Sequence, residues 1–536
     1  MSSIGRASVV IGAGTIVSRV TGFLRTVVLV SAVGSVQSRA GDAFATANQL
    51  PNNIFAIIST GILTAVLVPQ IVKASRDADQ GRAFVSKLFT LGTVVLLATT
   101  AIAMLIAPWL VTLYGPDFTE AQLALAIAFA YWCLPQIFFY GLYALIGEAL
   151  NARSIFGPFT WAPIVNNVVS IVGFGAFIVL FGSPVEIVTG WTPAMVALLG
   201  GTATLGIVAQ AAILLVYWRR TGLHVRPDFR WRGVGLGQVG RLAGWTFLMV
   251  LAGQLAGLVQ SRVLSAASGF GPAIFASQNA WLLFMLPYSI IVLSIGTPYF
   301  TRLSEHAAAG RDDDVRRDLV SSIRILGLFV MVATAGLAAA AIPASRIFTD
   351  SAESASAAAG VLLCYLVSLV PLAVLFVVQR TFYAYDDTRT PFFFTLLQTI
   401  IVVALTYAVG AFVDVDHLAA AVALAQSVAT IVQVIVATWL LERRLGRTGV
   451  GLWMRSLVRY AIAAVPAGFV GWGVYLLFGA DAGWMASDKI LGALGAAVIG
   501  IVCVAVYVVF LWLLRSPELR PAVDLVRRRL RRGAGE

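Results

Sequence analysis

Long runs of hydrophobic residues, separated by short polar stretches, dominate the pattern along this chain. Two of them, residues 88–113 and 490–514, contain no charged residue. Each is about 25 residues long, so a helix rising ~1.5 Å per residue would reach about 37 Å and cross a ~30 Å hydrocarbon core with some tilt. The same pattern predicts spans at 7–33, 43–70, 88–113, 122–149, 159–183, 193–217, 242–264, 272–298, 320–344, 356–379, 391–413, 417–440, 460–478 and 490–514.

The composition agrees with an all-α integral membrane protein of about fourteen transmembrane helices. Of the 536 residues, 59% are hydrophobic and 12% are charged, whereas soluble globular proteins carry roughly a quarter charged residues. The first seven residues contain one Arg and no small-residue cleavage pattern. The first hydrophobic run is therefore predicted to be an uncleaved span rather than a signal peptide.

Basic residues fall almost entirely on one side of the predicted membrane. If the N-terminus is cytoplasmic, the inner loops are basic, and the outer loops carry only Arg39, Arg346 and Lys489. The positive-inside rule then places both termini of a multi-pass membrane protein in the cytoplasm. Because this topology accounts for the net charge of +12, we infer no nucleic-acid partner.

An internal repeat is the next feature of the sequence. Its copies would share one orientation because they are six spans apart, which predicts two pseudo-symmetric six-helix lobes with a cavity between them, as in alternating-access carriers. We predict lobes at 1–218 and 241–444, a basic linker at 219–240, two extra C-terminal helices at 445–515 and a basic tail at 516–536. Three patterns recur at offsets of 243, 236 and 233 residues: 18–20 with 261–263, 50–61 with 286–296, and 149–158 with 382–391.

Three arginines lie where lipid would disfavour them. Arg19 is about twelve residues into the first predicted span and so near the membrane midplane, where an Arg costs ~2.5–3.5 kcal/mol on insertion scales. Arg25 is about two turns further out, and Arg262 lies near the outer end of the seventh span. The planar guanidinium suits phosphate, so Arg19 and Arg25 are predicted to bind an anionic ligand. The alternatives are an ion pair with a carboxylate such as Asp42, and for Arg262 a side chain that reaches the membrane interface.

Two further polar residues are candidates near the second span. Asp42 precedes that span and is interpreted as an N-cap or as a partner for a cavity Arg. Asn52 follows Pro51, and with Gly61 it marks a helix that we expect to be bent or broken, which is tolerated where protein or water satisfies the backbone. Together with the arginines, these residues form the predicted substrate-binding set Arg19, Arg25, Arg262, Asp42 and Asn52.

Motifs for enzymatic chemistry are missing from the sequence. No GxxxxGK[ST] occurs, so no built-in ATPase is expected. Cys133, Cys364 and Cys503 are far apart and form no CxxC, which implies neither a disulfide framework nor a zinc site. The three histidines lie in predicted loops or at a span end. We therefore predict a transporter with no cofactor, no metal site and no catalytic residues.

Five parts of the sequence follow a recognisable pattern: 18–25, 41–44 with 50–52, 150–153 with 162–167, 261–264, and 379–391. These stretches resemble the MurJ/MviN family of lipid II flippases, which belong to the MATE-like exporter superfamily. This resemblance implies fourteen helices in the bacterial cytoplasmic membrane, a cationic cavity for the pyrophosphate of an undecaprenyl-linked disaccharide-pentapeptide, and a groove for the lipid tail at spans thirteen and fourteen. Arg19, Arg25 and Asp42 match family positions implicated in function.

The chain departs from the family pattern at a few positions. Many members have a basic pair and a Glu after the Leu-Pro-Asn, where this chain has Phe55, Ala56 and Thr60. An eighth-span Arg is also absent, and Trp281 and Leu282 stand in its neighbourhood. Some cavity charge is therefore missing, which leaves open a divergent flippase for another polyprenyl-linked glycan.

The function predicted from the sequence is translocation of lipid II, the peptidoglycan precursor, from the inner to the outer leaflet by alternating access. The expected partners are lipid II or a related polyprenyl-pyrophosphate lipid, the membrane and cell-wall synthesis proteins. A MATE-like exporter of small cations would need an acidic or aromatic cavity, against which the basic spans argue. A non-transporting scaffold is the third possibility, and in it the midplane arginines would be purely structural.

Overall fold

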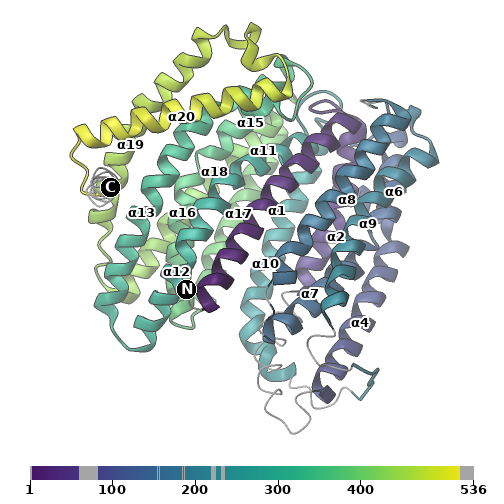
Figure 1. The fold of residues 1–536 in the computed structure, drawn as a ribbon, viewed down its shortest axis with the longest axis horizontal. Coiled ribbons are helices and arrows are strands. Elements are labelled where there is room, and N and C mark those ends of the chain that lie inside the picture. The colour runs from purple at the N-terminus through teal and green to yellow at the C-terminus, as the bar shows by residue number, and fades with distance from the viewer. Residues whose placement is uncertain are drawn as a thin grey trace, which may run out of the picture. The chain divides into compact units, whose positions relative to one another are not determined.

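The computed structural model describes residues 3–59, 82–153, 155, 157–183, 185, 187–218, 225–230 and 236–518. Within these ranges the chain forms helices and turns and no strand. Twelve of the described helical segments are long and apolar enough to cross a membrane, and they coincide with the last twelve predicted spans. The protein is therefore an all-helical, multi-pass membrane protein (Figure 1).

The first two predicted spans need separate mention. Helix α1 (Ser3–Val33) covers the first one, and its 31 residues are long enough to cross a bilayer. Helix α2 (Arg39–Ile58) covers the start of the second, and the remainder of that span lies outside the described residues. The total of fourteen helices thus stays a prediction. The second span was expected to be bent or broken. Helix α2 is not broken at Pro51, because it is continuous through that proline, and Gly61 lies outside the described residues.

The chain divides into two compact units. Unit 1 consists of Met1–Asn279 and Thr395–Val422, and unit 2 of Ala280–Phe394 and Ala423–Glu536. Helices α11, α17 and α18 contribute to both. Besides α1 and α2, the α-helices that begin in unit 1 are α4 (Arg82–Leu105), α5 (Ala107–Tyr114), α6 (Glu120–Cys133), α7 (Gln136–Ala152), α8 (Gly157–Phe181), α9 (Pro193–Trp218), α10 (Leu236–Ser265) and α11 (Ile274–Pro287).

Unit 2 contains most of the later helices of the described chain. Its first span continues α11 through a π-helical turn, Tyr288–Val292, directly after Pro287. The α-helices that begin in it are α12 (Leu293–Ala308), α13 (Asp312–Ala339), α14 (Ala341–Arg346), α15 (Ala352–Leu366), α16 (Leu369–Ala384), α17 (Arg389–Phe412), α19 (Val450–Leu477) and α20 (Lys489–Leu513). Helix α18 (Leu418–Leu445) also begins in unit 1, in its second segment, and ends in unit 2.

The predicted repeat appears in the order of helices and helix breaks. A long helix followed by a short one occurs at α4–α5 and again at α13–α14, with a proline early in each short helix. A span broken near its middle follows in both copies, as α6–α7 and as α15–α16. The first helix of each broken span begins at a hydroxyl N-cap, Thr119 in one copy and Ser351 in the other. Two unbroken helices complete each copy.

Small residues allow the helices of unit 1 to approach closely. A Cβ added to Gly141 of α7 would lie 2.2 Å from Leu96 Cδ2 of α4, and one added to Gly173 of α8 would lie 2.4 Å from Thr202 Cγ2 of α9. In lipid the hydrophobic effect does not drive helices together, so such close packing supplies much of their association. These contacts hold α4, α7, α8 and α9 as a bundle beside which α1 and α2 are positioned.

Candidate functional site

Helix α1 packs on α8 through small and hydroxyl residues. A Cβ added to Gly14 would lie 2.8 Å from Thr160 Cγ2. Two turns further along, the Nδ2 of Asn167 donates to the Ser18 carbonyl oxygen at 3.1 Å and to Thr21 Oγ1 at 2.9 Å. Two of the stretches that carry the family resemblance, 18–25 and 162–167, are therefore bonded to each other. The Asn167 amide therefore holds one face of α1 against α8, and this fixes which residues of α1 face away from α8.

Arg19 lies on a side of α1 that points away from α8. Its side chain is exposed, as are those of Val20 and Leu24 on the following turns. Arg25 is half-buried. Within the described part of the chain, neither arginine forms an ion pair with a carboxylate. The alternative considered from the sequence, an ion pair of one of these arginines with Asp42, is therefore not found among the described residues.

Helices α2 and α7 run side by side and meet at two contacts. At the start of α7 the Nε2 of Gln136 donates to Asn48 Oδ1 of α2 at 3.1 Å. One α7 turn further on, the rings of Phe55 and Tyr140 stack with a centroid separation of 5.7 Å and an interplanar angle of 22°. Asn52 lies between these two contacts on the same stripe of α2, and its side chain is exposed. The amide of Asn52 is thus available to a ligand.

Arg25 belongs to the same group of residues. Its guanidinium lies close enough to the Tyr140 hydroxyl for the two to interact electrostatically. Tyr140 itself makes no hydrogen bond to any described residue. We call Arg25, Tyr140, Phe55 and Asn52 the α1–α2–α7 cluster; ring stacking joins Phe55 to Tyr140, and Arg25 is related to Tyr140 by electrostatic interaction alone. It combines a cation, an amide and two aromatic rings.

Asp42 is a helix cap, but not of its own helix. The N-cap of α2 is Ser38, whose Oγ accepts from the Gly41 N–H at 2.9 Å. The buried Asp42 carboxylate instead accepts from the Phe275 N–H at 2.8 Å and from Ser268 Oγ at 2.6 Å. Asp42 thus caps the first turn of α11, where the helix dipole favours a negative charge. The prediction of a cap was right about the role and wrong about the helix.

Neighbouring polar groups extend the Asp42 contact into a network. Ser268 also accepts from Gln122 Nε2 at 2.7 Å, and the same amide reaches the Arg39 carbonyl oxygen at 3.1 Å. Nearby, Gln37 Nε2 donates to the Phe270 carbonyl oxygen at 2.9 Å. These bonds attach the segment between α10 and α11 to α2 and α6.

Arg262 has a different environment from Arg19. It lies in the last turn of α10 and is half-buried. Its Nη1 donates to the carbonyl oxygen of Leu113 in α5 at 3.0 Å. Within one turn, Ser265 Oγ donates to Asp117 Oδ2 at 2.9 Å, which also ties α10 to the segment after α5. The Arg262 side chain thus connects α10 to α5. No hydrogen bond among the described residues joins it to the α1–α2–α7 cluster.

The sequence-based set therefore divides into two groups. Arg25 and Asn52 belong to the α1–α2–α7 cluster, with Arg19 exposed on the same helix as Arg25. Asp42 and Arg262 instead support the connections between helices. Sequence reasoning missed Tyr140, because an aromatic residue in an apolar run carries no signal of its own. Within the described ranges, no group of three His, Cys, Asp or Glu side chains is placed to hold a metal ion.

Comparisons with known proteins now place the chain. A family model described as lipid II flippase MurJ matches residues 34–487. The chain belongs to the lipid II flippase MurJ family. A probable lipid II flippase MurJ from Haemophilus influenzae is 25% identical over 409 residues, which cover 70% of this chain and 75% of that protein. One from Rhizobium tropici is 24% identical over 551 residues, covering 99% and 97%.

Solved structures agree on the fold of the MurJ family. A lipid II flippase MurJ in an inward closed conformation matches with a TM-score of 0.73 at 18% identity, over 96% of this chain and 100% of that one. An inward-facing multidrug resistance MATE transporter of the MOP superfamily matches with a TM-score of 0.60 at 16% identity, over 77% and 96%. Members of the MurJ family are transporters rather than enzymes, as the sequence predicted.

Proposed function

We propose that this protein moves lipid II from the cytoplasmic to the outer leaflet of the bacterial cytoplasmic membrane. One observation carries the proposal: Arg19 and Arg25 lie on a membrane-spanning helix without a carboxylate partner among the described residues. An unpaired guanidinium in lipid is costly and is retained where an anion binds. Membership of the lipid II flippase MurJ family supports the pyrophosphate of that lipid as the proposed anion.

The chemistry of the two arginines suits this substrate. Each guanidinium can donate parallel hydrogen bonds to phosphate oxygens, and in a site shielded from bulk water such bonds are stronger than in water. Asn52 can add a neutral donor and acceptor. Asp42 and Arg262, which we first assigned to substrate binding, would act through the position of α11 and α10. The mechanism is alternating access between two lobes, and a membrane potential or an ion gradient would drive it, since no nucleotide motif is present.

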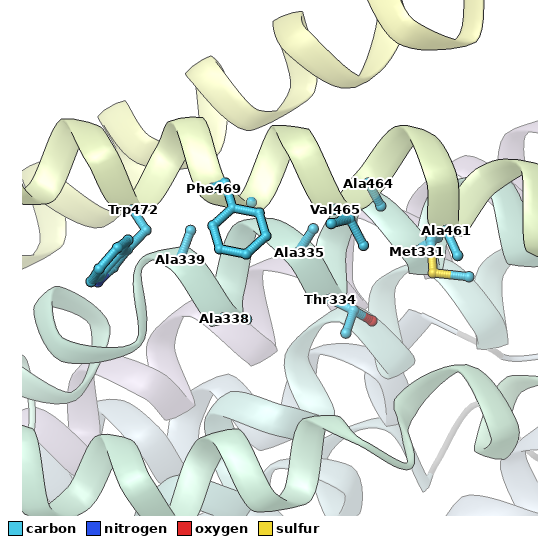
Figure 2. Close-up of a pocket in the computed structure, with 11 residues that line it drawn as sticks. Met331, Thr334, Ala335, Ala338, Ala339, Ala461, Ala464, Val465, Phe469 and Trp472 are labelled. Carbon is cyan, nitrogen blue, oxygen red and sulfur yellow. The ribbon is translucent and has the colours of Figure 1, made fainter. Parts of the chain in front are cut away.

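A cavity in unit 2 is consistent with a groove for the polyprenyl tail, although it lies between α13 and α19 rather than between the predicted pair α19 and α20. This cavity of about 390 Å³ lies between α13 and α19, and Figure 2 shows Phe469 and Trp472 on one side of it and small residues such as Ala335 on the other. The Thr334 hydroxyl in its wall is bonded to the Val330 carbonyl oxygen at 2.8 Å, so the surface offered to a ligand is apolar. A second cavity of about 600 Å³ lies between α13 and α20.

The finer organisation is part of the same proposal. Both termini are proposed to face the cytoplasm, with lobes at 1–218 and 241–444, a linker at 219–240, groove helices at 445–515 and a tail at 516–536. Cell-wall synthesis proteins are the proposed protein partners, because lipid II is their substrate. The bias of basic residues toward one side supports this orientation.

The proposal is tested by measuring how much lipid II is accessible from the outer leaflet in cells depleted of this protein. Depletion is expected to leave lipid II in the inner leaflet, and wild-type protein is expected to restore outer-leaflet labelling. Arg19→Ala and Arg25→Ala should not restore it although they reach the membrane in normal amounts. Arg230→Ala is the matched control, because that side chain is 89% exposed and pairs only locally with Asp228. Unchanged labelling after depletion would overturn the function.

A further inference from the structure

Arg380 of α16 lies close to three aromatic rings. Its guanidinium carbon is 5.0 Å from the ring centroid of Phe300 on α12, and 5.2 Å and 5.9 Å from those of Phe376 and Tyr383 on its own helix. All three separations are within the range of cation–π attraction. Helices α12 and α16 lie side by side in unit 2 (Figure 1). We call these four residues the Arg380 cage.

The fold holds the rings of the cage in place. A Cβ added to Gly296 of α12 would lie 2.4 Å from Phe376 Cε1, so a glycine allows the two helices to approach this closely. The Tyr383 hydroxyl accepts from Gln379 Nε2 at 2.8 Å. Tyr288, in the π-helical turn of unit 2, packs edge-on against Phe376 with a centroid separation of 6.4 Å. Such turns often occur at functional sites, and this one extends the aromatic wall beside the guanidinium.

The cage leaves the donor groups of Arg380 without an acceptor. In the described chain this arginine forms neither a hydrogen bond nor an ion pair. Its side chain is half-buried, and none of its nitrogen atoms is sealed inside the protein. Arg302 of α12 differs, because it lies 5.7 Å from the Tyr299 ring centroid and also pairs with Asp318 at 2.6 Å. Rings hold a guanidinium without neutralising its charge, so the Arg380 cage lacks an anion among the described residues.

The position of Arg380 along its helix restricts the anion. Arg380 directly follows the predicted span 356–379 and stands four residues, about 6 Å, before the end of α16 at Ala384. We therefore expect it at the boundary between hydrocarbon and headgroups, where the phosphate groups of lipids lie. A guanidinium can keep its faces on aromatic rings while its N–H groups donate in plane to two phosphate oxygens. Basic pockets between helices at this depth suit anionic headgroups.

We propose that the Arg380 cage binds the phosphate group of a membrane lipid in the leaflet at the end of α16. Two kinds of lipid carry that chemistry: a polyprenyl pyrophosphate, such as the proposed substrate, and an anionic phospholipid of the bilayer. The inference goes beyond the proposed function, because a phospholipid would bind here whether or not the protein moves lipid II. It also gives unit 2 an anion-binding arginine of its own, whereas Arg19 and Arg25 belong to unit 1.

The test measures lipid binding to the purified full-length protein by native mass spectrometry. Phosphatidylglycerol and undecaprenyl pyrophosphate are added singly, as are their phosphate-free counterparts diacylglycerol and undecaprenol. Arg380→Gln should weaken binding of at least one phosphate lipid by about 5- to 10-fold and leave both phosphate-free lipids unchanged, because charge-assisted hydrogen bonds are lost. Arg380→Lys, which loses the planar fork, and Phe300→Leu, which loses one ring, should weaken it by about 2- to 3-fold. Phe300→Tyr should bind like the wild type.

Arg443→Gln is the matched control. Arg443 is an exposed arginine that begins in the same unit and lies over a single ring, that of Trp439, at 3.6 Å from its centroid. Its substitution removes the same charge as Arg380→Gln but no cage. All four affinities should stay within about twofold of the wild type, since exposed charges attract lipid only weakly and without a fixed geometry.

The lipid that loses affinity identifies the source of the phosphate. Loss for undecaprenyl pyrophosphate alone assigns the cage to the transported lipid, loss for phosphatidylglycerol alone assigns it to the bilayer, and loss for both assigns it to lipid phosphate in general. The site is rejected if the wild type binds neither phosphate lipid, or if Arg380→Gln binds both like the wild type. It is also rejected if Arg443→Gln causes the same loss, which would indicate diffuse attraction.

Two further features keep the result clear. If Arg380→Gln does not fold, Arg380→Lys and Phe300→Leu decide, because both retain the cation of the cage. Outer-leaflet labelling of lipid II, which tests the proposed function, is not read in this experiment. Failure of the cage and failure of the proposed function are therefore separate outcomes.

Discussion

The same tripeptide, Ser-Arg-Val, occurs once in α1 and once in α10, and the two copies differ in what surrounds the arginine. Arg19 lies well inside α1, is exposed and has no carboxylate partner among the described residues. Arg262 lies in the last turn of α10, is half-buried and donates to the Leu113 carbonyl oxygen at 3.0 Å. Identical tripeptides at corresponding places of the repeat therefore have different surroundings.

The difference has a physical origin in the position along the helix. A guanidinium in the last turn can reach the carbonyl groups at a neighbouring helix end, which are short of donors. Away from a helix end, backbone carbonyls are occupied by the helix itself, so a guanidinium there needs a side chain, water or a ligand. Arg19 consequently remains available for an anion, whereas Arg262 is used by the protein.

The largest expected effect comes from removing the arginines of α1. Arg19→Ala or Arg25→Ala should reduce lipid II translocation by about 10- to 100-fold, since each loses charge-assisted hydrogen bonds to phosphate. Outer-leaflet labelling of lipid II, normalised to the amount of protein in the membrane, measures this loss. Arg19→Lys should retain part of the activity because the charge remains and the planar fork is lost. Normal transport by both alanine variants would mean that these arginines are structural.

Asp42→Ala is expected to have the next largest effect, on stability. The substitution leaves the Phe275 N–H and the Ser268 hydroxyl without their acceptor in a buried site, which should cost about 2 kcal/mol. A lower midpoint in thermal unfolding of the detergent-solubilised protein is the measurement. Asp42→Asn keeps one acceptor and should lose less. A stable Asp42→Ala variant would show that α11 does not depend on this cap.

Arg262→Ala tests the difference between Arg19 and Arg262 most directly. It should lower the free energy of unfolding by about 1 kcal/mol, because one hydrogen bond to a backbone carbonyl is lost. Lipid II binding by the folded protein should be unchanged. Weaker binding of lipid II with unchanged unfolding would reverse the assignment and return Arg262 to the substrate site.

The smallest effect is expected at an arginine whose partner is already present. Arg324 pairs with Glu518, whose side chain is 10% exposed. Burial alone would raise the pKa of Glu518, but hydrogen bonds from Ser516 and Arg324 lower it below its ordinary value of 4.5. The carboxylate therefore stabilises the fold above that pH and loses this contribution as the pH falls below it.

Arg324→Gln should reduce stability at neutral pH by about 0.5 kcal/mol, since the arginine is partly solvated. The wild type should lose the stability contributed by this pair as the pH falls below about 4.5, and Arg324→Gln should show much less of this loss. Acid unfolding followed by tryptophan fluorescence would measure the difference. Identical acid unfolding of variant and wild type would show that the pair adds nothing.

Much of the architecture could be predicted from the sequence because the bilayer restricts the choice. Apolar runs of about 20 residues can cross it only as helices, so the positions of the last twelve spans follow from hydropathy alone. The breaks inside these helices were harder to predict from the sequence. The helix with Pro51 was expected to be bent or broken, yet α2 is unbroken at that proline, whereas a π-helical turn follows its repeat counterpart Pro287. Tertiary packing, which a local pattern does not contain, decides between these outcomes.

The candidate site was predictable only where a residue was out of place. Arg19 and Arg25 could be recognised in the sequence because transferring a charged side chain into lipid is unfavourable in free energy. Tyr140 and Phe55 are unremarkable in an apolar span, so their stacking and their nearness to Arg25 required the fold. Asp42 was recognisable as a cap, but its target, the first turn of α11, is more than 200 residues away in sequence.

The sequence by itself determined that this protein spans a membrane and that its two halves repeat. It also showed which charged residues lie inside predicted spans, where lipid disfavours them. These follow from the free energy of transferring side chains into lipid, which depends on local composition. Tertiary structure alone decided which of those residues stay free for a ligand. That choice depends on the few ångströms between a side chain and a distant carbonyl, hydroxyl or ring, and only packing sets those distances.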